Sequence, residues 1–242
     1  MGFRTIIKED WLTRKPKEHA LWVTFILSAM LLIASYFFLN GILNANEWMP
    51  ASGELVFKNH EYWRAWSTLF AHGDIVHILG NLFLFTLFSY FLTSYYHIFF
   101  FPILGFALGG VINLLVLKTM PEEVLLIGVS AVVYWMGAAW ITLAVFIDRR
   151  EPFKRRVLKG LGVSMLLFLP DSYRGDVSYL SHFLGYAFGV TSGYVYYLLR
   201  RKQFHAAEKV ELVHDFNDEF DYQERAQADN QSQADAEDLQ PS

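Results

Sequence analysis

Cysteine is absent from this chain of 242 residues, and its absence excludes three kinds of chemistry. Without a thiol the protein has no disulfide, no thiolate metal site and no cysteine nucleophile. Charge is also scarce, because Asp, Glu, Lys and Arg together make up 18% of the residues. The hydrophobic content is instead 54%, against about 45–50% in an ordinary soluble domain. Since the apolar residues are concentrated in blocks, the composition is typical of a protein that crosses a membrane several times.

Six apolar blocks predict an all-α membrane protein with six transmembrane helices. A helix needs about 20 residues to cross a hydrocarbon core of about 30 Å. Four blocks reach this length, namely Ala20–Leu39, Ile75–Tyr96, His97–Leu117 and Val124–Ile147. The block Tyr179–Leu199 carries no charge, whereas Val157–Leu169 is short and contains Lys159. We therefore expect a membrane domain over residues 20–200, with its first block kept as an anchor.

The positive charges predict that both termini lie in the cytoplasm. With six crossings, the segments that flank the spans on the side of the N-terminus hold fourteen Lys and Arg residues, and the loops on the opposite side hold four. Cytoplasmic flanks are enriched in these residues. If the short fifth block did not cross, Arg200, Arg201 and Lys202 would lie outside, so we interpret this block as a short or tilted span.

Three regions lie outside the predicted spans. Residues 1–19 form a cytoplasmic N-terminal segment. The segment 40–74 is a long outer loop dense in aromatic residues, which favour the membrane–water interface, so we expect it to be embedded in the membrane surface. Residues 201–242 are acidic and rich in Gln and Ala. They predict a solvated, disordered cytoplasmic tail, with room for a short helix over 210–220.

Four polar side chains lie at a similar predicted depth on three different spans. Ser130 follows Glu123 by seven residues and His182 follows Asp176 by six, which places both about 10 Å below the outer surface. His77 and Asn81 are four residues apart, so they share one face of the second span. Polar groups are costly within a membrane and mark functional sites there.

Small residues favour contact between the fourth and sixth spans. Gly185, Gly189 and Gly193 form a stripe that lets two helices approach closely. Such an approach would bring Ser130 and His182 together, where the imidazole can take the serine proton. No carboxylate lies beside either residue in the sequence, so the pattern predicts a dyad.

Acyl transfer also needs hydrogen-bond donors for the developing oxyanion. The side chains of His77 and Asn81 and the amide of Ser130 can supply them.

These residues belong to short motifs that follow one another in a fixed order along the chain. The first outer loop carries Trp63-Arg64, and His72, His77 and Asn81 lie at and in the second span. The fourth span has Gly128-Val129-Ser130-Ala131 followed by Tyr134 and Gly137, and the sixth has His182, Gly185 and Gly189. In this combination the chain resembles the rhomboid family of intramembrane serine proteases over about residues 20–200, most of all its compact bacterial branch with six helices.

The resemblance implies a role for each matching residue. Ser130 would be the nucleophile, His182 the general base, and His77, Asn81 and the Ser130 amide the oxyanion hole. Tyr134 would pack against His182, Trp63 and Arg64 would anchor the outer loop, and His72 would order it. The glycines Gly128, Gly185 and Gly189 would support the packing. The fifth helix and residues 170–178 would act as substrate gate and cap.

The family also implies a substrate class and a location. Substrates would be single-span membrane proteins cut at or near their transmembrane segment, and the protein would lie in the lipid bilayer of a bacterial cytoplasmic membrane. We expect no cofactor and no nucleic-acid partner. The histidines lack carboxylate companions at ligand spacing, so we also expect no metal.

Two other functions stay open at the level of sequence. The family usually has Gly after the nucleophile, and this chain has Ala131. Its methyl group could push the sixth span away, which motivates a catalytically inactive relative that binds transmembrane clients.

Taken alone, Ser130 is typical of a packing serine, and His182 of a structural histidine or a proton relay. Buried His77, Asn81 and His182 would also suit a transporter, but the chain shows no inverted repeat.

Overall fold

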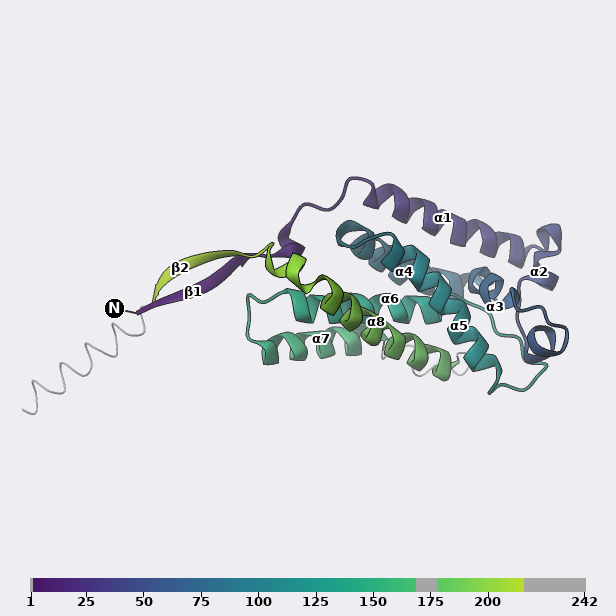
Figure 1. Cartoon of the computed structure of the whole chain (residues 1–242). Coiled ribbons are helices and arrows are strands. Elements are labelled where there is room, and N and C mark those ends of the chain that lie inside the picture. Colours follow the sequence, from purple (N-terminus) through teal and green to yellow (C-terminus); the bar gives the residue numbers. More distant parts are fainter. Residues whose placement is uncertain (1, 169–177, 216–242) are drawn as a thin grey trace, which may run out of the picture.

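The protein is described by a computed structural model that covers residues 2–168 and 178–215. In this described part, six long helices run alongside one another and a two-stranded ribbon projects from one end of the bundle (Figure 1). The helices are α1 (Ala20–Leu39), α4 (Ile75–Tyr95), α5 (Gly105–Leu117), α6 (Ser130–Ile147), α7 (Phe153–Phe168) and α8 (Tyr179–His205). The predicted helical bundle is confirmed.

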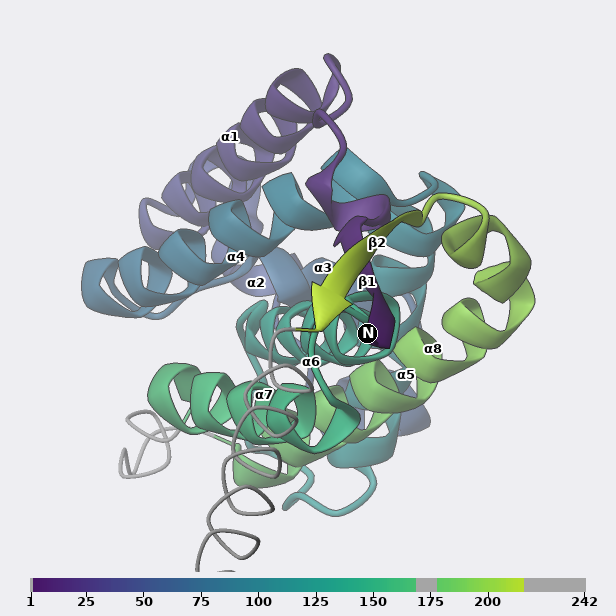
Figure 2. The same cartoon turned by 90° about the vertical axis from the view of Figure 1, so that its left-hand side faces the viewer.

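Helix α6 lies at the centre of this bundle. It packs against α4, α5, α7 and α8, and its contact with α8 is the most extensive between any two elements of the described chain (Figure 2). All its residues from Ala131 to Ala139 are buried. A central helix of this kind is apolar all round, because every face meets another helix.

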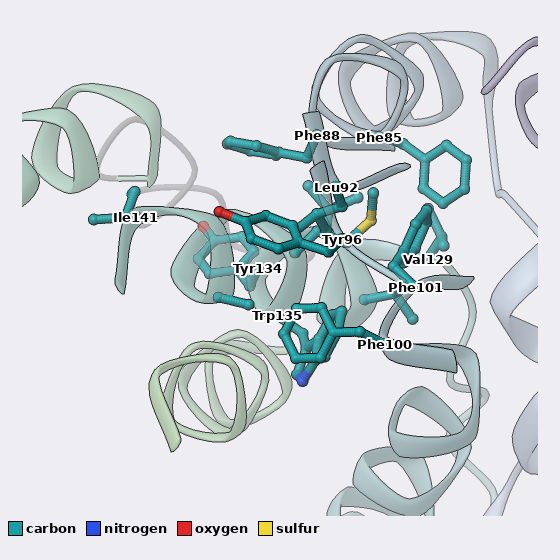
Figure 3. Close-up of a cluster of buried hydrophobic side chains, with 14 of the residues drawn as sticks. Phe85, Phe88, Leu92, Tyr96, Phe100, Phe101, Val129, Tyr134, Trp135 and Ile141 are labelled. Atoms are coloured by element: carbon teal, nitrogen blue, oxygen red, sulfur yellow. The ribbon is translucent and has the colours of Figure 1, made fainter. Parts of the chain in front are cut away.

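Aromatic side chains fill the space between α4, α6 and the turn that precedes α5. Phe85, Phe88, Phe100, Phe101 and Trp135 are all buried there (Figure 3). The Trp135 ring lies 5.3 Å from that of Phe100. The indole N–H of Trp135 also donates to the Ser192 hydroxyl at 3.1 Å, so the one polar atom of this ring is satisfied by α8.

Four helical stretches are long and apolar enough to cross a membrane. They are Ala20–Leu39, Ile75–Tyr95, Phe99–Leu117 and Ser130–Ile147. Among the described helices, α7 is too short to meet this criterion, and α8 is long enough but not sufficiently apolar. Helix α7 has 16 residues and several cations in its first half, and α8 is rich in Gly and Tyr.

The third and fourth predicted spans start differently in the structure. Before α5, the short helix η5 (Phe99–Leu104) contains a break at Phe101, which is extended because it precedes Pro102. The fourth span was expected from Val124, but α6 begins at Ser130. Leu126 instead pairs with Ala51 as an isolated antiparallel bridge. This pairing keeps the backbone before Ser130 extended and out of the helix.

The outer loop 40–74 folds into short helical turns. They are η2 (Ile42–Asn44), α2 (Ala45–Trp48), η3 (Glu54–Lys58), α3 (Arg64–Ser67) and η4 (Thr68–Phe70). Trp66 packs directly over Gly110, since a Cβ atom on that glycine would lie 2.1 Å from the indole. The loop is therefore packed against α5.

Both predicted terminal segments contain structure that the composition did not indicate. Strand β1 (Gly2–Glu9) pairs antiparallel with β2 (Lys209–Asp215), with Thr5 opposite Leu212. The expectation of a disordered tail from residue 201 is thus wrong as far as Asp215, because α8 continues to His205 and a strand follows. The short helix for which the sequence leaves room over 210–220 does not form at residues 210–215, which belong to β2. Residues 216–242 lie outside the described part.

The base of the ribbon is fastened to the bundle by residues 10–17. Asp10 is 1% exposed and caps the turn η1 (Trp11–Thr13), accepting the amide of Leu12 at 2.8 Å. The Trp11 indole N–H donates to the Tyr95 carbonyl at 3.0 Å, and its ring meets Phe204 edge-on. These contacts join the ends of α4 and α8 to the start of the chain.

Candidate active site

Helices α6 and α8 approach so closely that only glycine fits at the contact. A Cβ atom on Gly185 would lie 2.4 Å from the Ala131 carbonyl oxygen, and one on Gly189 would lie 2.4 Å from that of Trp135. One turn further, Gly193 is held in the same way against Ala139. The three glycines therefore form a continuous interface that brings the two backbones together.

Ser130 is the first residue of α6, and the local sequence explains why the helix starts there. Gly128 has φ +113°, a value that a side chain would strain, and this conformation stops any helix from running through it. The Gly128 amide donates to the Thr68 carbonyl at 3.0 Å, and the Thr68 hydroxyl donates to the Leu126 carbonyl. Ser130 is half-buried. Its amide N–H lies in the first turn of α6, where the N–H groups have no acceptor within the helix.

His182 lies in the first turn of α8 and is 6% exposed. Its ring stacks on Tyr134, with centroids 4.1 Å apart and planes 14° from parallel. The Tyr134 hydroxyl donates to the Phe168 carbonyl at 3.1 Å. Because Tyr134 is one turn after Ser130 on the same helix, this stack holds the imidazole beside the first turn of α6.

His77 reaches the same region from the start of α4. The Asp74 carboxylate caps this helix and accepts the His77 amide at 2.8 Å. A Cβ atom on Gly128 would lie 3.1 Å from two ring atoms of His77, so the imidazole faces the backbone two residues before Ser130. Asn81 is half-buried one turn further along α4.

A cavity of about 520 Å³ opens between these elements. Its walls come from the start of α4, the segment 120–130 and the start of α8. The polar side chains that line it are Asp74, His77, Ser130, Ser178 and Ser181. Neither Asn81 nor His182 lines this space, although their helices border it. The cavity is wide and polar enough to admit water to Ser130.

The model of the Rhomboid domain matches residues 59–199, which is more than half of the chain. The chain belongs to the rhomboid family. The matched region contains every predicted site residue, from Trp63 to Gly189. A search of curated proteins finds no match.

Rhomboid membership and the four apolar helices together make this an integral membrane protein. The bundle of long helices around α6 is the corresponding fold.

His72, the remaining histidine of the rhomboid motif, is buried beneath His77. The two rings are 5.0 Å apart and nearly perpendicular. The His72 Nδ1 atom lies 2.9 Å from the Ser35 hydroxyl, whose single proton is within reach of the Leu31 carbonyl at 2.8 Å and the Phe70 carbonyl at 3.0 Å. Burial, with a smaller contribution from His77, lowers the pKa of His72 to about 3. His72 is therefore neutral at neutral pH and joins α1 to the loop before α4.

Arg64 organises the outer loop of this rhomboid through its guanidinium group. Its Nη1 atom donates to the carbonyls of Glu47, Trp48 and Pro50 at 2.8–3.0 Å, and its Nε atom pairs with Glu61. The guanidinium also lies over the ring of Trp63, 4.9 Å from its centroid. Arg64 is 7% exposed, so the loop is folded around a buried cation with satisfied donors.

Sequence reasoning missed four contributors to the site. Asp74 and Ser178 cap α4 and α8, and Ser181 accompanies them in lining the cavity. A polar residue immediately before an apolar run is a cap signal that could have identified the first two. Phe168, at the end of α7, was missed because only the fold places it against Tyr134, 4.5 Å between centroids. The expected cap 170–178 lies outside the described residues apart from Ser178.

Nothing among the described residues forms a cluster of three or more His, Cys, Asp or Glu side chains able to hold a metal ion. The candidate site offers a hydroxyl, imidazoles, an amide side chain and backbone N–H groups.

Proposed function

We propose that this rhomboid protein is a serine endopeptidase that cleaves single-span membrane proteins at or near their transmembrane segment. The observation that supports this most is the stack of His182 on Tyr134, together with the contact of Gly185 with Ala131. These contacts hold an imidazole of α8 beside the first turn of α6, where Ser130 faces a cavity. A serine hydroxyl needs such a base to become a nucleophile.

The first half of the proposed reaction forms an acyl–enzyme. The Ser130 oxygen attacks the carbonyl carbon of the scissile peptide bond while His182 accepts the hydroxyl proton. The carbonyl oxygen becomes an oxyanion, which His77, Asn81 and the Ser130 N–H stabilise. His182 then gives the proton to the leaving amine as the C–N bond breaks.

The second half restores the enzyme. A water molecule from the cavity attacks the acyl carbonyl and gives a proton to His182. The ester bond to Ser130 breaks, the serine oxygen takes the proton back, and the carboxylic acid product leaves.

The proposed topology has six crossings with both termini in the cytoplasm of a bacterial cell. The pairing of β1 with β2 supports it, because strands that pair lie on the same side of the membrane. The number of crossings between them must then be even, so α7 and α8 either both cross or both do not. The close packing of α8 along α6 favours crossing by both.

An inactive relative that binds transmembrane clients is the second candidate, and Ala131 motivates it. Ala131 is 1% exposed, and the approach of Gly185 is to its backbone. The close contact of α6 with α8 thus exists with alanine at this position, which favours the protease over the inactive relative.

The two candidates are separated by cleavage of a transmembrane reporter in liposomes and by labelling with a serine-directed phosphonate. We expect the wild-type protein to cleave and to be labelled at Ser130, and Ser130→Ala and His182→Ala each to abolish both. The matched control is Ser89→Ala on α4, whose hydroxyl is buried with no hydrogen-bond partner among the described residues and whose loss should be nearly neutral. Turnover by Ser130→Ala would exclude the proposed mechanism, and a folded wild-type protein that neither cleaves nor labels would indicate the binding protein.

A further inference from the structure

A second cavity, of about 190 Å³, lies between α6 and α7, at the end of the helices away from Ser130. From α6 it is lined by residues at positions 140, 141, 144, 145 and 148, which form one helix face. From α7 it is lined by Arg156, Lys159, Gly160 and Val163, and Glu151 from the preceding turn also lines it. The space is apolar along most of its length and charged at one end.

The charged end of the cavity retains one positive group without a paired carboxylate. Asp148 is held by Arg150 through two hydrogen bonds of 2.7 and 2.8 Å, and Glu151 accepts from Lys159 at 2.6 Å. Each acid thus has a cationic partner other than Arg156, although Arg150 also contacts the buried Asp10 at 3.4 Å and the second carboxylate oxygen of Glu151 is buried without a hydrogen-bond partner among the described residues. Within the described chain no ion pair joins Arg156 to an acid.

Arg156 is also short of hydrogen-bond acceptors. Its Nη1 atom donates to the Val145 carbonyl, but its Nε atom is buried with no partner among the described groups. The guanidinium lies over the Phe153 ring, 5.3 Å from the centroid, which holds it at the edge of the bundle. A buried donor without an acceptor is costly, so the site favours an additional anionic oxygen.

The surroundings add further positive charge. The turn between α6 and α7 and the first half of α7 carry Arg149, Arg150, Lys154, Arg155, Arg156 and Lys159, against Asp148 and Glu151. This turn follows the end of the apolar helix α6, so it lies where a membrane helix meets the headgroup layer. Basic pockets between transmembrane helices at this level bind anionic headgroups.

We propose that this cavity is a binding site for one anionic phospholipid. The phosphate accepts hydrogen bonds from Arg156, and an acyl chain lies along the apolar face formed by Trp140, Ala144 and Val163. Gly160 lets the two helices approach closely at the cavity, since a Cβ atom there would meet Val145 at 2.9 Å. The site thus matches a ligand that is charged at one end and apolar along its length.

The test is retention of lipid by the full-length protein, measured by native mass spectrometry from bilayers of phosphatidylglycerol and phosphatidylcholine. The salt concentration is about 0.5 M, where a Debye length of roughly 4 Å screens the exposed charges. We expect the wild type to keep one phosphatidylglycerol in preference to phosphatidylcholine. Arg156→Gln should weaken this retention about fivefold, the effect of one cation near a headgroup.

Two further variants define the site. Arg155→Gln is the matched control, because it removes the same charge from the neighbouring position, which is exposed and does not line the cavity. We expect it to retain lipid like the wild type. Ala144→Phe fills the apolar part and should prevent retention without changing any charge. Arg156→Lys keeps the charge and should retain most of the lipid that Arg156→Gln loses. Thermal unfolding shows which variants are folded.

Several results would overturn the proposal. If Arg155→Gln and Arg156→Gln lose phosphatidylglycerol retention equally, the lipid is held only by the general positive charge of this surface. Equal retention of phosphatidylcholine would mean that no headgroup is recognised. Displacement of the lipid by glycerol 3-phosphate alone would identify a site for free phosphate. Full retention by folded Arg156→Gln would show that the lipid binds elsewhere.

Discussion

Replacing Gly185 with alanine tests whether the contact between α6 and α8 holds the site together. The added Cβ atom would lie 2.4 Å from the Ala131 carbonyl oxygen and 3.2 Å from the Ala131 Cα atom. Ordinary contacts begin at 3.4 Å, so α8 must move away by the difference, 1.0 Å. The obstacle is backbone, which cannot rotate aside as a side chain can.

This movement acts directly on the proposed base. His182 precedes Gly185 by less than one turn, so its imidazole shifts with the helix and away from Tyr134. A misplacement of about 1 Å can reduce catalysis about 10²-fold. We therefore expect kcat/KM of Gly185→Ala to fall about 10²-fold, which equals about 2.7 kcal/mol of lost transition-state stabilisation.

The assay is cleavage of a transmembrane reporter in liposomes, with thermal unfolding measured on the same samples. Gly80→Ala is the matched control, because it lies on α4 between His77 and Asn81 and a Cβ atom there meets nothing within 4 Å. It should cleave like the wild type. If Gly185→Ala cleaves as fast as Gly80→Ala, the close approach of α8 does not position His182, and our reasoning about the glycine stripe is wrong.

Three other changes test the supporting structure. His72 has a folded pKa of about 3 against 6.5 unfolded, so its contribution to stability is complete above pH 6.5 and is lost as the pH falls toward 3. At pH 5 this loss is about 2 kcal/mol, and thermal unfolding of His72→Gln should be less sensitive to pH than that of the wild type; equal sensitivity would contradict the buried neutral imidazole. Asp10→Ala removes the cap of η1 and the contact with Arg150 at 3.4 Å, so we expect a loss of about 1 kcal/mol and faster proteolysis of residues 2–9, whereas Asp10→Asn should keep the cap. Gly110→Ala forces Trp66 from its position and should destabilise the fold by about 1–3 kcal/mol in thermal unfolding, with recovery in the double variant Trp66→Ala; no recovery would place the strain elsewhere.

The sequence by itself determined the elements whose cause is local. A membrane of fixed thickness demands long apolar runs, and these runs located the helices α1, α4 and α8 to within a few residues at their starts. The spacing of Gly185, Gly189 and Gly193 predicted a packing face, because residues four apart share a side of a helix. The ordered motifs identified the family without any knowledge of the contacts.

Only the tertiary structure decided where distant segments meet. Helix α6 starts at Ser130 because loop residues bind the backbone before it, and hydropathy alone extends the span to Val124. Strands β1 and β2 pair across about two hundred residues, and neither segment signals its partner. The stack of Tyr134 on His182 likewise arises between helices, as does the guanidinium of Arg156 that forms no ion pair in the described part of the chain. Local preference fixes what a segment can form, whereas the packing of the whole chain fixes which polar groups are brought together and which are left without a partner.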